Sequence, residues 1–349
     1  MMVRGCRWLL VFLHAASADK KCRCDAPEIV DALAAVAPPA PLRLSVRGAR
    51  PLSPQLVLIK IPETGSSTAA ALLSELAAKR GIPCWQHGGA LSFAAAVEKR
   101  PKGDPKWALA HRGWGPWVEA HFERKQRMVV TTARDPTKRL YSRGEKRVLR
   151  GEPVNCKEGA DVAIRFWSAD GKRGEGLKKT AESVVAKFED VWVMERYNES
   201  LVAFALTHGL PLGDVVPPLA KYHDRDAPKN ATKPPSSRQS AYAKARWTCE
   251  RDKVEATRAF ALETRVHAAA SAALDARVAK LESSGVAWRD LVALFSRHLH
   301  VAMTLGAQIR DNSAVFGDDR QSSSTLLMSA CARGCAMRAL DAAAVLDYG

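Results

Sequence analysis

Several features that would assign this chain to a common class of protein are missing from its sequence. No internal stretch is apolar over the roughly 20 residues that a membrane-spanning helix needs. The G-x-x-x-x-G-K-[ST] pattern of nucleotide-binding P-loops is absent, and so is any recognisable DNA- or RNA-binding motif. No internal repeat is visible. These absences argue against a multi-span membrane protein, a P-loop kinase that uses ATP, a nucleic-acid-binding protein and a repeat protein.

Acidic residues are scarce relative to basic ones. The 349 residues include 53 Lys and Arg against 37 Asp and Glu, which gives a net charge of +16. A basic chain favours anionic partners, such as an acidic glycan, a phosphate-bearing cofactor, nucleic acid or an anionic membrane. Because 47% of the residues are hydrophobic, the chain can bury a sizeable core, as one large domain or two small ones.

The N-terminus has the pattern of a targeting segment. Arg4 and Arg7 precede the apolar run WLLVFLHAA, which leads into the small residues ASA at 16–18. A positive start, a short apolar run and an A-x-A-like site are typical of a cleaved secretory signal. We therefore expect residues 1–18 to be a signal peptide, with a short type II membrane anchor as the alternative.

The cysteines agree with an oxidising compartment. Cys6 lies in the expected signal, and an odd number remains: Cys22, Cys24, Cys84, Cys156, Cys249, Cys331 and Cys335. These permit up to three disulfides and leave one thiol. Cys331 and Cys335 lack a nearby histidine or second cysteine pair, so we expect no metal site. Two sequons, at Asn198 and Asn230, are compatible with a glycoprotein.

The rest of the chain falls into three parts. Residues 19–54 are rich in Ala and Pro and are interpreted as a stem or linker. Residues 313–349 form a Ser- and Ala-rich tail that carries a cysteine pair. Between them, residues 55–312 alternate short buried-type strands with helices, which predicts an α/β domain with a central parallel sheet flanked by helices. The strands are expected at 55–61, 107–114, 127–136 and 191–194.

The first stretch with chemical content is IKIPETGSST at residues 59–68. It follows an expected strand and precedes an expected helix, and it holds one glycine and three hydroxyls. Consecutive backbone N–H groups at a helix N-terminus suit an oxyanion. The alternative is that Ser66 or Ser67 only caps the helix.

The second stretch is TTARDPTKRLYS, which ends at Ser142. Arg134 ends an expected strand, and an arginine in that place can hold a phosphate in bidentate fashion. Ser142 lies about two helical turns further on, and Arg139 could join them. The alternative is an ion pair of Arg134 with Asp135 or another acid.

Together the two stretches resemble motifs of the PAPS-dependent carbohydrate sulfotransferases of the Golgi, of the galactose 3-O and heparan sulfate 2-O type. PETGSST at 62–68 is similar to the family pattern P-K-T-G/A-S-[ST]-[ST], and RDPTKRLYS at 134–142 matches R-[DE]-P-x-x-R-x-x-S. VWVMERYNESLVAF at 191–204 looks like the family's E-R-[FY]-[DN]-E-S-L segment. KNATKPPSSRQSAYAKAR at 229–246 resembles its nucleotide-covering loop. The resemblance covers residues 56 to 305.

The resemblance implies a P-loop-like sulfotransferase fold that moves a sulfuryl group from PAPS to a glycan hydroxyl and releases PAP, without a metal. It implies that the 3′-phosphate lies on Arg134 and Ser142, and that Lys233 belongs to the covering loop. The 5′ end is expected on Glu63, Thr64, Gly65, Ser66, Ser67 and Thr68. The implied location is the Golgi lumen, secreted or anchored through the N-terminus. The expected acceptor is an acidic glycan or proteoglycan rather than nucleic acid.

A catalytic base is expected between the two phosphate motifs. His111, in WALAHRGW, lies where the family has its histidine. A histidine is well suited to take the proton that a sugar hydroxyl loses as it attacks sulfur. The alternative is a histidine that only packs between Trp107 and Trp114.

Glu63 is the departure from the family pattern, which has a lysine at this place. That lysine would stabilise the charge that builds on the leaving phosphate, whereas a carboxylate should repel it. Lys60 is a candidate replacement, although three positions along a strand point it to the other face. A basic residue of the covering loop is another. The third possibility is a catalytically weak or inactive glycan-binding protein with the same fold.

Overall fold

The structure is a computed structural model of the chain. Apart from residues 112 and 165, it describes residues 24–87, 106–155, 162–167, 180–217, 237–248, 257–313 and 333–348. The chain divides into two compact units, each treated by itself below. The larger unit comprises Arg50–Phe204 and His223–Lys280, and the smaller one comprises Met1–Ala49, Ala205–Tyr222 and Leu281–Gly349.

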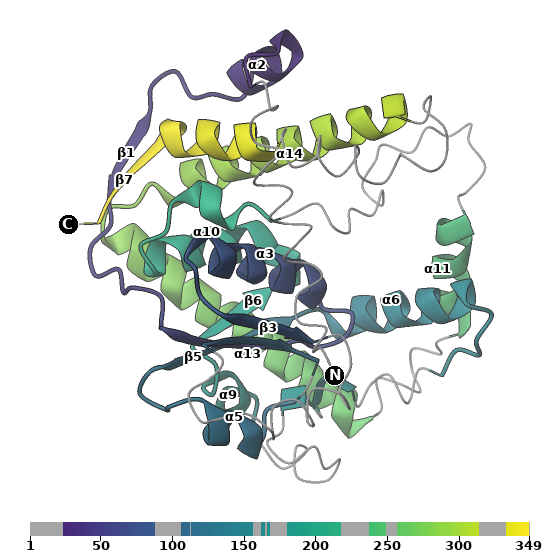
Figure 1. Cartoon of the computed structure of the whole chain (residues 1–349). Coiled ribbons are helices and arrows are strands. Elements are labelled where there is room, and N and C mark those ends of the chain that lie inside the picture. The colour runs from purple at the N-terminus through teal and green to yellow at the C-terminus, as the bar shows by residue number, and fades with distance from the viewer. Residues whose placement is uncertain are drawn as a thin grey trace, which may run out of the picture. The chain divides into compact units, whose positions relative to one another are not determined.

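The larger unit is built on a five-stranded sheet in which every pair of neighbours is parallel (Figure 1). Its order is β3-β4-β2-β5-β6. The strands are β2 Gln55–Ile59, β3 Cys84–His87, β4 Trp107–Ala110, β5 Arg127–Ala133 and β6 Asp190–Val193. The predicted α/β class with a central parallel sheet is therefore confirmed. Sequence reasoning missed β3 and placed the other four strands to within a few residues.

Helices cover both faces of this sheet, which is why its strands are apolar throughout. In Figure 1, α3 (Ser66–Lys79) lies on one face, and α5 (Pro116–His121), α9 (Ala181–Val185) and α13 (Arg258–Ser283) lie on the other. Val57 and Ile59 share a core cluster with residues of α5, α9 and α13. Successive strand residues alternate between the two faces, so both sets are buried.

Two further helices of the larger unit pack against each other. The helix α6, Pro136–Leu149, follows β5, and α11, Ser237–Thr248, packs against it. A Cβ on Gly144 of α6 would lie only 2.8 Å from the Cβ of Ala245. Gly144 therefore permits the close approach of the two helices.

The strand order creates a topological switch point. After β2 the chain passes to the β3–β4 side of the sheet, whereas after β5 it passes to β6 on the opposite side. Ligands of open α/β sheets bind outside the carboxyl ends of strands at such a point. The register pairs Ile59 with both Ala110 and Thr131, so β4 and β2 end level with each other and the neighbouring β5 ends two residues later.

The smaller unit joins the two ends of the chain. Strands β1 (Leu42–Ser45) and β7 (Ala344–Asp347) form a parallel pair, and a disulfide links Cys24 to Cys335, 311 residues later. The unit also holds α2 (Pro27–Ala34), the 3₁₀ turn η3 (Leu212–Val215), α14 (Trp288–Ser313) and a helical segment at 333–343. The helix α10 (Tyr197–Thr207) crosses the boundary between the units.

These findings correct the expectation that 19–54 is a stem and 313–349 a tail. Ile29, Val301 and Cys335 share a small buried cluster, and Leu44 and Val46 are buried as well. The described parts of both segments are therefore folded, and their partners lie roughly 300 residues away. The disulfide between Cys24 and Cys335 is consistent with the expected disulfides, for which the sequence predicted no partners, and Cys84 is not part of a disulfide.

The expected signal at 1–18 lies outside the described residues, as do Cys22 and Cys331. Among the residues that are described, no helix is long and apolar enough to cross a membrane.

Candidate functional site

The loop after β2 is shaped by its own hydroxyls. Thr64 Oγ1 donates to the Ile61 carbonyl at 2.9 Å, and Ser66 Oγ donates to the same carbonyl at 2.7 Å. Both residues are almost fully buried. Each hydroxyl has one proton, which is already used within the loop. With these protons used inside the protein, the backbone N–H groups are what Thr64 and Ser66 offer to an oxyanion, and the assignment of a donor's 5′ end to this loop stays a prediction.

Gly65 is required by the geometry of this loop. It is the N-cap of α3 with φ +70°, and no side chain caps the helix. The alternative that Ser66 or Ser67 serves as a side-chain cap is thus wrong. A Cβ at Gly65 would lie 2.2 Å from Cε of Met194, in the 3₁₀ turn η2 (Met194–Arg196). The segment at 191–204 therefore packs directly against PETGSST at 62–68.

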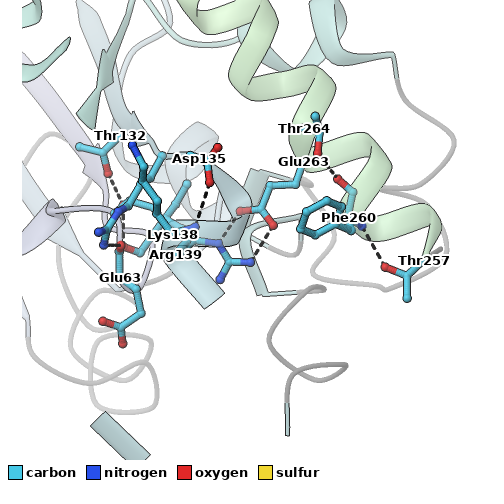
Figure 2. A network of polar contacts seen from close by, with 12 residues as sticks. Glu63, Thr132, Asp135, Lys138, Arg139, Thr257, Phe260, Glu263 and Thr264 are labelled. Atoms are coloured by element: carbon cyan, nitrogen blue, oxygen red, sulfur yellow. Dashed lines mark hydrogen bonds and ion pairs between the residues drawn. The ribbon is translucent and has the colours of Figure 1, made fainter. Parts of the chain in front are cut away.

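Glu63 has an unusual backbone conformation. Its φ is +66°, and it is the one non-glycine residue with positive φ in the described part of the chain. Such strain costs on the order of 1–3 kcal/mol and is often found at ligand sites. The carboxylate forms an ion pair with Lys146 of α6. In Figure 2 it points away from Thr132.

Arg134 points at the same loop from the end of β5. Its Nη1 donates to the Glu63 carbonyl at 2.9 Å. Asp135 instead acts as N-cap of α6, where its side chain accepts from the Lys138 N–H at 2.9 Å. Ser142 is 9% exposed and lies two turns into α6. The second motif thus brings its arginine to the loop after β2, and its binding of a 3′-phosphate stays a prediction.

Arg139 has a different role from the one considered for it. Its Nε and Nη2 both donate to the carboxylate of Glu263 in α13, and the two side chains are 0% and 1% exposed. Figure 2 shows the guanidinium and the carboxylate facing each other. Burial raises the pKa of Glu263, while Arg139 opposes this shift. Arg139 therefore anchors α6 to α13, and the hypothesis that it holds a phosphate is wrong.

His111 lies at the carboxyl end of β4, next to β2. Its Nδ1 is 3.0 Å from the Lys60 carbonyl. A carbonyl only accepts hydrogen bonds, so Nδ1 carries the proton and Nε2 is the basic nitrogen of the neutral ring. This arrangement suits a general base. The Lys60 residue itself is only 5% exposed. Because successive side chains along a strand point to opposite faces of the sheet, those of Lys60 and Ile61 are expected on different faces.

The segment after β6 supports these loops. Glu195 accepts a hydrogen bond from the Asp135 N–H at 3.2 Å and lies 3.0 Å from Nε2 of His267. Burial alone would raise the pKa of Glu195, but the contacts with His267 and with the Asp135 N–H outweigh it and lower that pKa. Ser200 Oγ accepts from the Val193 N–H at 3.0 Å. The segment at 191–204 therefore has a supporting role, because its contacts link the end of β5, β6 and α13.

Several contributors to the site gave no local signal in the sequence. Lys146, Glu263 and His267 lie 83, 124 and 72 positions from the residues they contact. Only the fold reveals such pairings. Lys233 and the rest of the expected covering loop lie outside the described residues, although α11, which follows that loop, packs against α6. The described residues contain no group of three or more potential metal ligands.

Comparisons of the chain with protein-family models, with curated proteins and with solved structures found no match.

Proposed function

We propose that the chain is a sulfotransferase that moves a sulfuryl group from PAPS to a hydroxyl of an acidic glycan. One observation carries the proposal. Three neighbouring strand ends bring together a helix-capping loop, Arg134 and His111, and both of these side chains contact that loop's backbone, at the carbonyls of Glu63 and Lys60.

In the proposed reaction the start of α3, the pair Arg134 and Ser142, and His111 have separate roles. The N–H groups at the start of α3 hold the 5′-phosphosulfate, since the first turn of a helix has donors without intrahelical acceptors. Arg134 and Ser142 hold the 3′-phosphate. The acceptor oxygen bonds to sulfur as the bond between sulfur and the bridging oxygen breaks. The electron pair of that bond remains on the phosphate of PAP, and His111 Nε2 takes the acceptor's proton.

The acceptor class and the location belong to the same proposal. A net charge of +16 favours an acidic or already sulfated glycan. A disulfide between Cys24 and Cys335 is typical of the secretory pathway, which agrees with the Golgi lumen.

A glycan-binding protein of the same fold without transferase activity is the second candidate. The observation that favours it is the loop itself, in which Glu63 stands in place of lysine and the hydroxyls of Thr64 and Ser66 are used internally. Such a protein would bind acidic glycans and would not bind PAP.

Binding of PAP to the wild type and to the variant Arg134→Ala separates these candidates. We expect PAP, but not ATP, to raise the melting temperature of the wild type. Loss of a charged hydrogen-bond donor should weaken PAP binding roughly 10- to 100-fold in Arg134→Ala. Arg80→Ala is the matched control, because Arg80 is exposed at the opposite end of α3. A wild type without PAP binding, or equal binding by Arg134→Ala, would refute the proposal.

A further inference from the structure

The carboxylate of Glu63, in the loop after β2, forms an ion pair with Lys146 of α6. We propose that Lys146 supplies, from α6, the positive charge for the 5′-phosphosulfate of the donor, and that Glu63 holds it beside the loop. This inference rests on the proposed function. It names a donor-binding cation outside the loop and outside every motif of the sequence.

The geometry of α6 places Lys146 beside the proposed site. Lys146 follows Ser142 by four positions, so both side chains lie on one face of the helix. The Lys146 side chain is 40% exposed, whereas that of Glu63 is 12% exposed. The ammonium therefore reaches the loop from the solvent side, where a donor would approach. The buried pair of Arg139 with Glu263 fixes the helix that carries it.

Two cations converge on residue 63. Arg134 donates to its backbone carbonyl, and Lys146 pairs with its carboxylate. The positive φ of Glu63 is a strained conformation, and it is held where these two contacts meet. One loop residue thus contacts both cations, of which the proposal assigns Arg134 to the 3′-phosphate and Lys146 to the 5′-phosphosulfate. The carboxylate of Glu63 is compensated by Lys146 rather than directed unpaired at the donor.

The proposed role in transfer follows from where charge builds. As the bond between sulfur and the bridging oxygen breaks, negative charge moves onto the 5′-phosphate. Lys146, in contact with that phosphate, stabilises this charge. The proton of the acceptor goes to His111, so no proton transfer is assigned to Lys146. The sulfuryl group, the electron pair and the proton are thus all accounted for, and the transfer needs no further reactant.

The competing explanation is an ordinary surface ion pair. The chain offers a matched example, because Lys79 and Glu75 of α3 are 39% and 18% exposed and lie 3.9 Å apart. Lys79 is in the last turn of α3, and Gly65 caps the first, about 20 Å away at 1.5 Å per residue. Lys79→Met changes the net charge as Lys146→Met does, but far from the loop.

Calorimetric titration with two nucleotides tests the proposal. PAP carries both phosphates, and adenosine 3′-phosphate lacks the 5′-phosphate. We expect Lys146→Met to weaken PAP binding about tenfold or more and to leave adenosine 3′-phosphate unchanged. Lys79→Met should bind both as the wild type does. Melting temperatures recorded alongside report any loss of folding.

The double variant Glu63→Gln/Lys146→Met removes the remaining ambiguity. It has no unpaired carboxylate, so it stays informative even if Lys146→Met folds poorly. We expect its PAP binding to remain weak. Restored PAP binding in the double variant would show that the unpaired carboxylate alone caused the loss. Wild-type PAP affinity in Lys146→Met would show that Lys146 does not contribute. Either outcome would overturn the inference and leave the proposed function standing. A wild type that binds neither nucleotide would end both proposals.

Discussion

Replacing Glu263 by glutamine will lower the free energy of unfolding by about 3–5 kcal/mol, because it leaves the Arg139 guanidinium buried without a counter-charge. Both partners are at most 1% exposed, so water cannot take the place of the carboxylate. A loss of this size is a large share of the 5–15 kcal/mol by which domains are usually stable. Urea denaturation followed by circular dichroism measures it.

Glu119→Gln is the matched control for this prediction. Glu119 also pairs in bidentate fashion with an arginine, Arg127, but its side chain is 53% exposed. Pairs that water reaches contribute at most about 1 kcal/mol. The double variant Arg139→Met/Glu263→Leu removes both charges and should recover most of the lost stability. Similar losses in Glu263→Gln and Glu119→Gln would contradict the assignment of a buried anchor for α6.

Replacing His111 by asparagine should lower the rate of sulfate transfer roughly 10²- to 10⁴-fold, the usual contribution of a general base. Asparagine keeps an N–H donor for the Lys60 carbonyl, so the strand end is preserved while the basic nitrogen is lost. We therefore expect unchanged melting temperature and unchanged PAP affinity. The measurement is transfer of labelled sulfate from PAPS to a panel of galactose-terminated and uronic-acid-containing glycans.

The control for this variant is a histidine away from the site. His300 is exposed on α14 in the smaller unit, and His300→Asn should transfer sulfate at the wild-type rate. An active His111→Asn would show that another group takes the acceptor's proton. Reduced PAP affinity in His111→Asn would instead indicate that the histidine serves to shape the loop.

Much of the larger unit could be predicted from the sequence because its signals are local. The run QLVLI at 55–59 is apolar throughout and ends in a Gly- and Ser-containing turn, so strand, loop and helix follow in order. The same holds for β5 and α6. The edge strand β3 was missed because CWQH at 84–87 has no periodic pattern to distinguish it from a loop.

The smaller unit could not be predicted because its contacts are distant in sequence. β1 and β7 pair across roughly 300 residues, and an Ala- and Pro-rich composition before β1 is typical of linkers. Nothing in either segment alone indicates the other. The disulfide of Cys24 was one of many pairings that seven cysteines allow.

The candidate site shows the same division. Arg134 was predicted from its place at a strand end and His111 from the family resemblance, and the structure brings both to the loop. Arg139 was misassigned because its spacing in the motif says nothing of Glu263, 124 residues away. The ion pair of Glu63 with Lys146 was equally hidden, although it changes how the carboxylate in the loop is understood.

The most direct test of a donor site at this sheet edge is a crystal structure of the wild-type protein with PAP. Our account predicts the 5′-phosphate against the N–H groups at the start of α3, within hydrogen-bond distance of Lys146. It predicts the 3′-phosphate on Arg134 and Ser142, with His111 facing the space where sulfur would lie. PAP bound elsewhere, or a loop that stays empty in crystals grown at saturating PAP, would contradict the account.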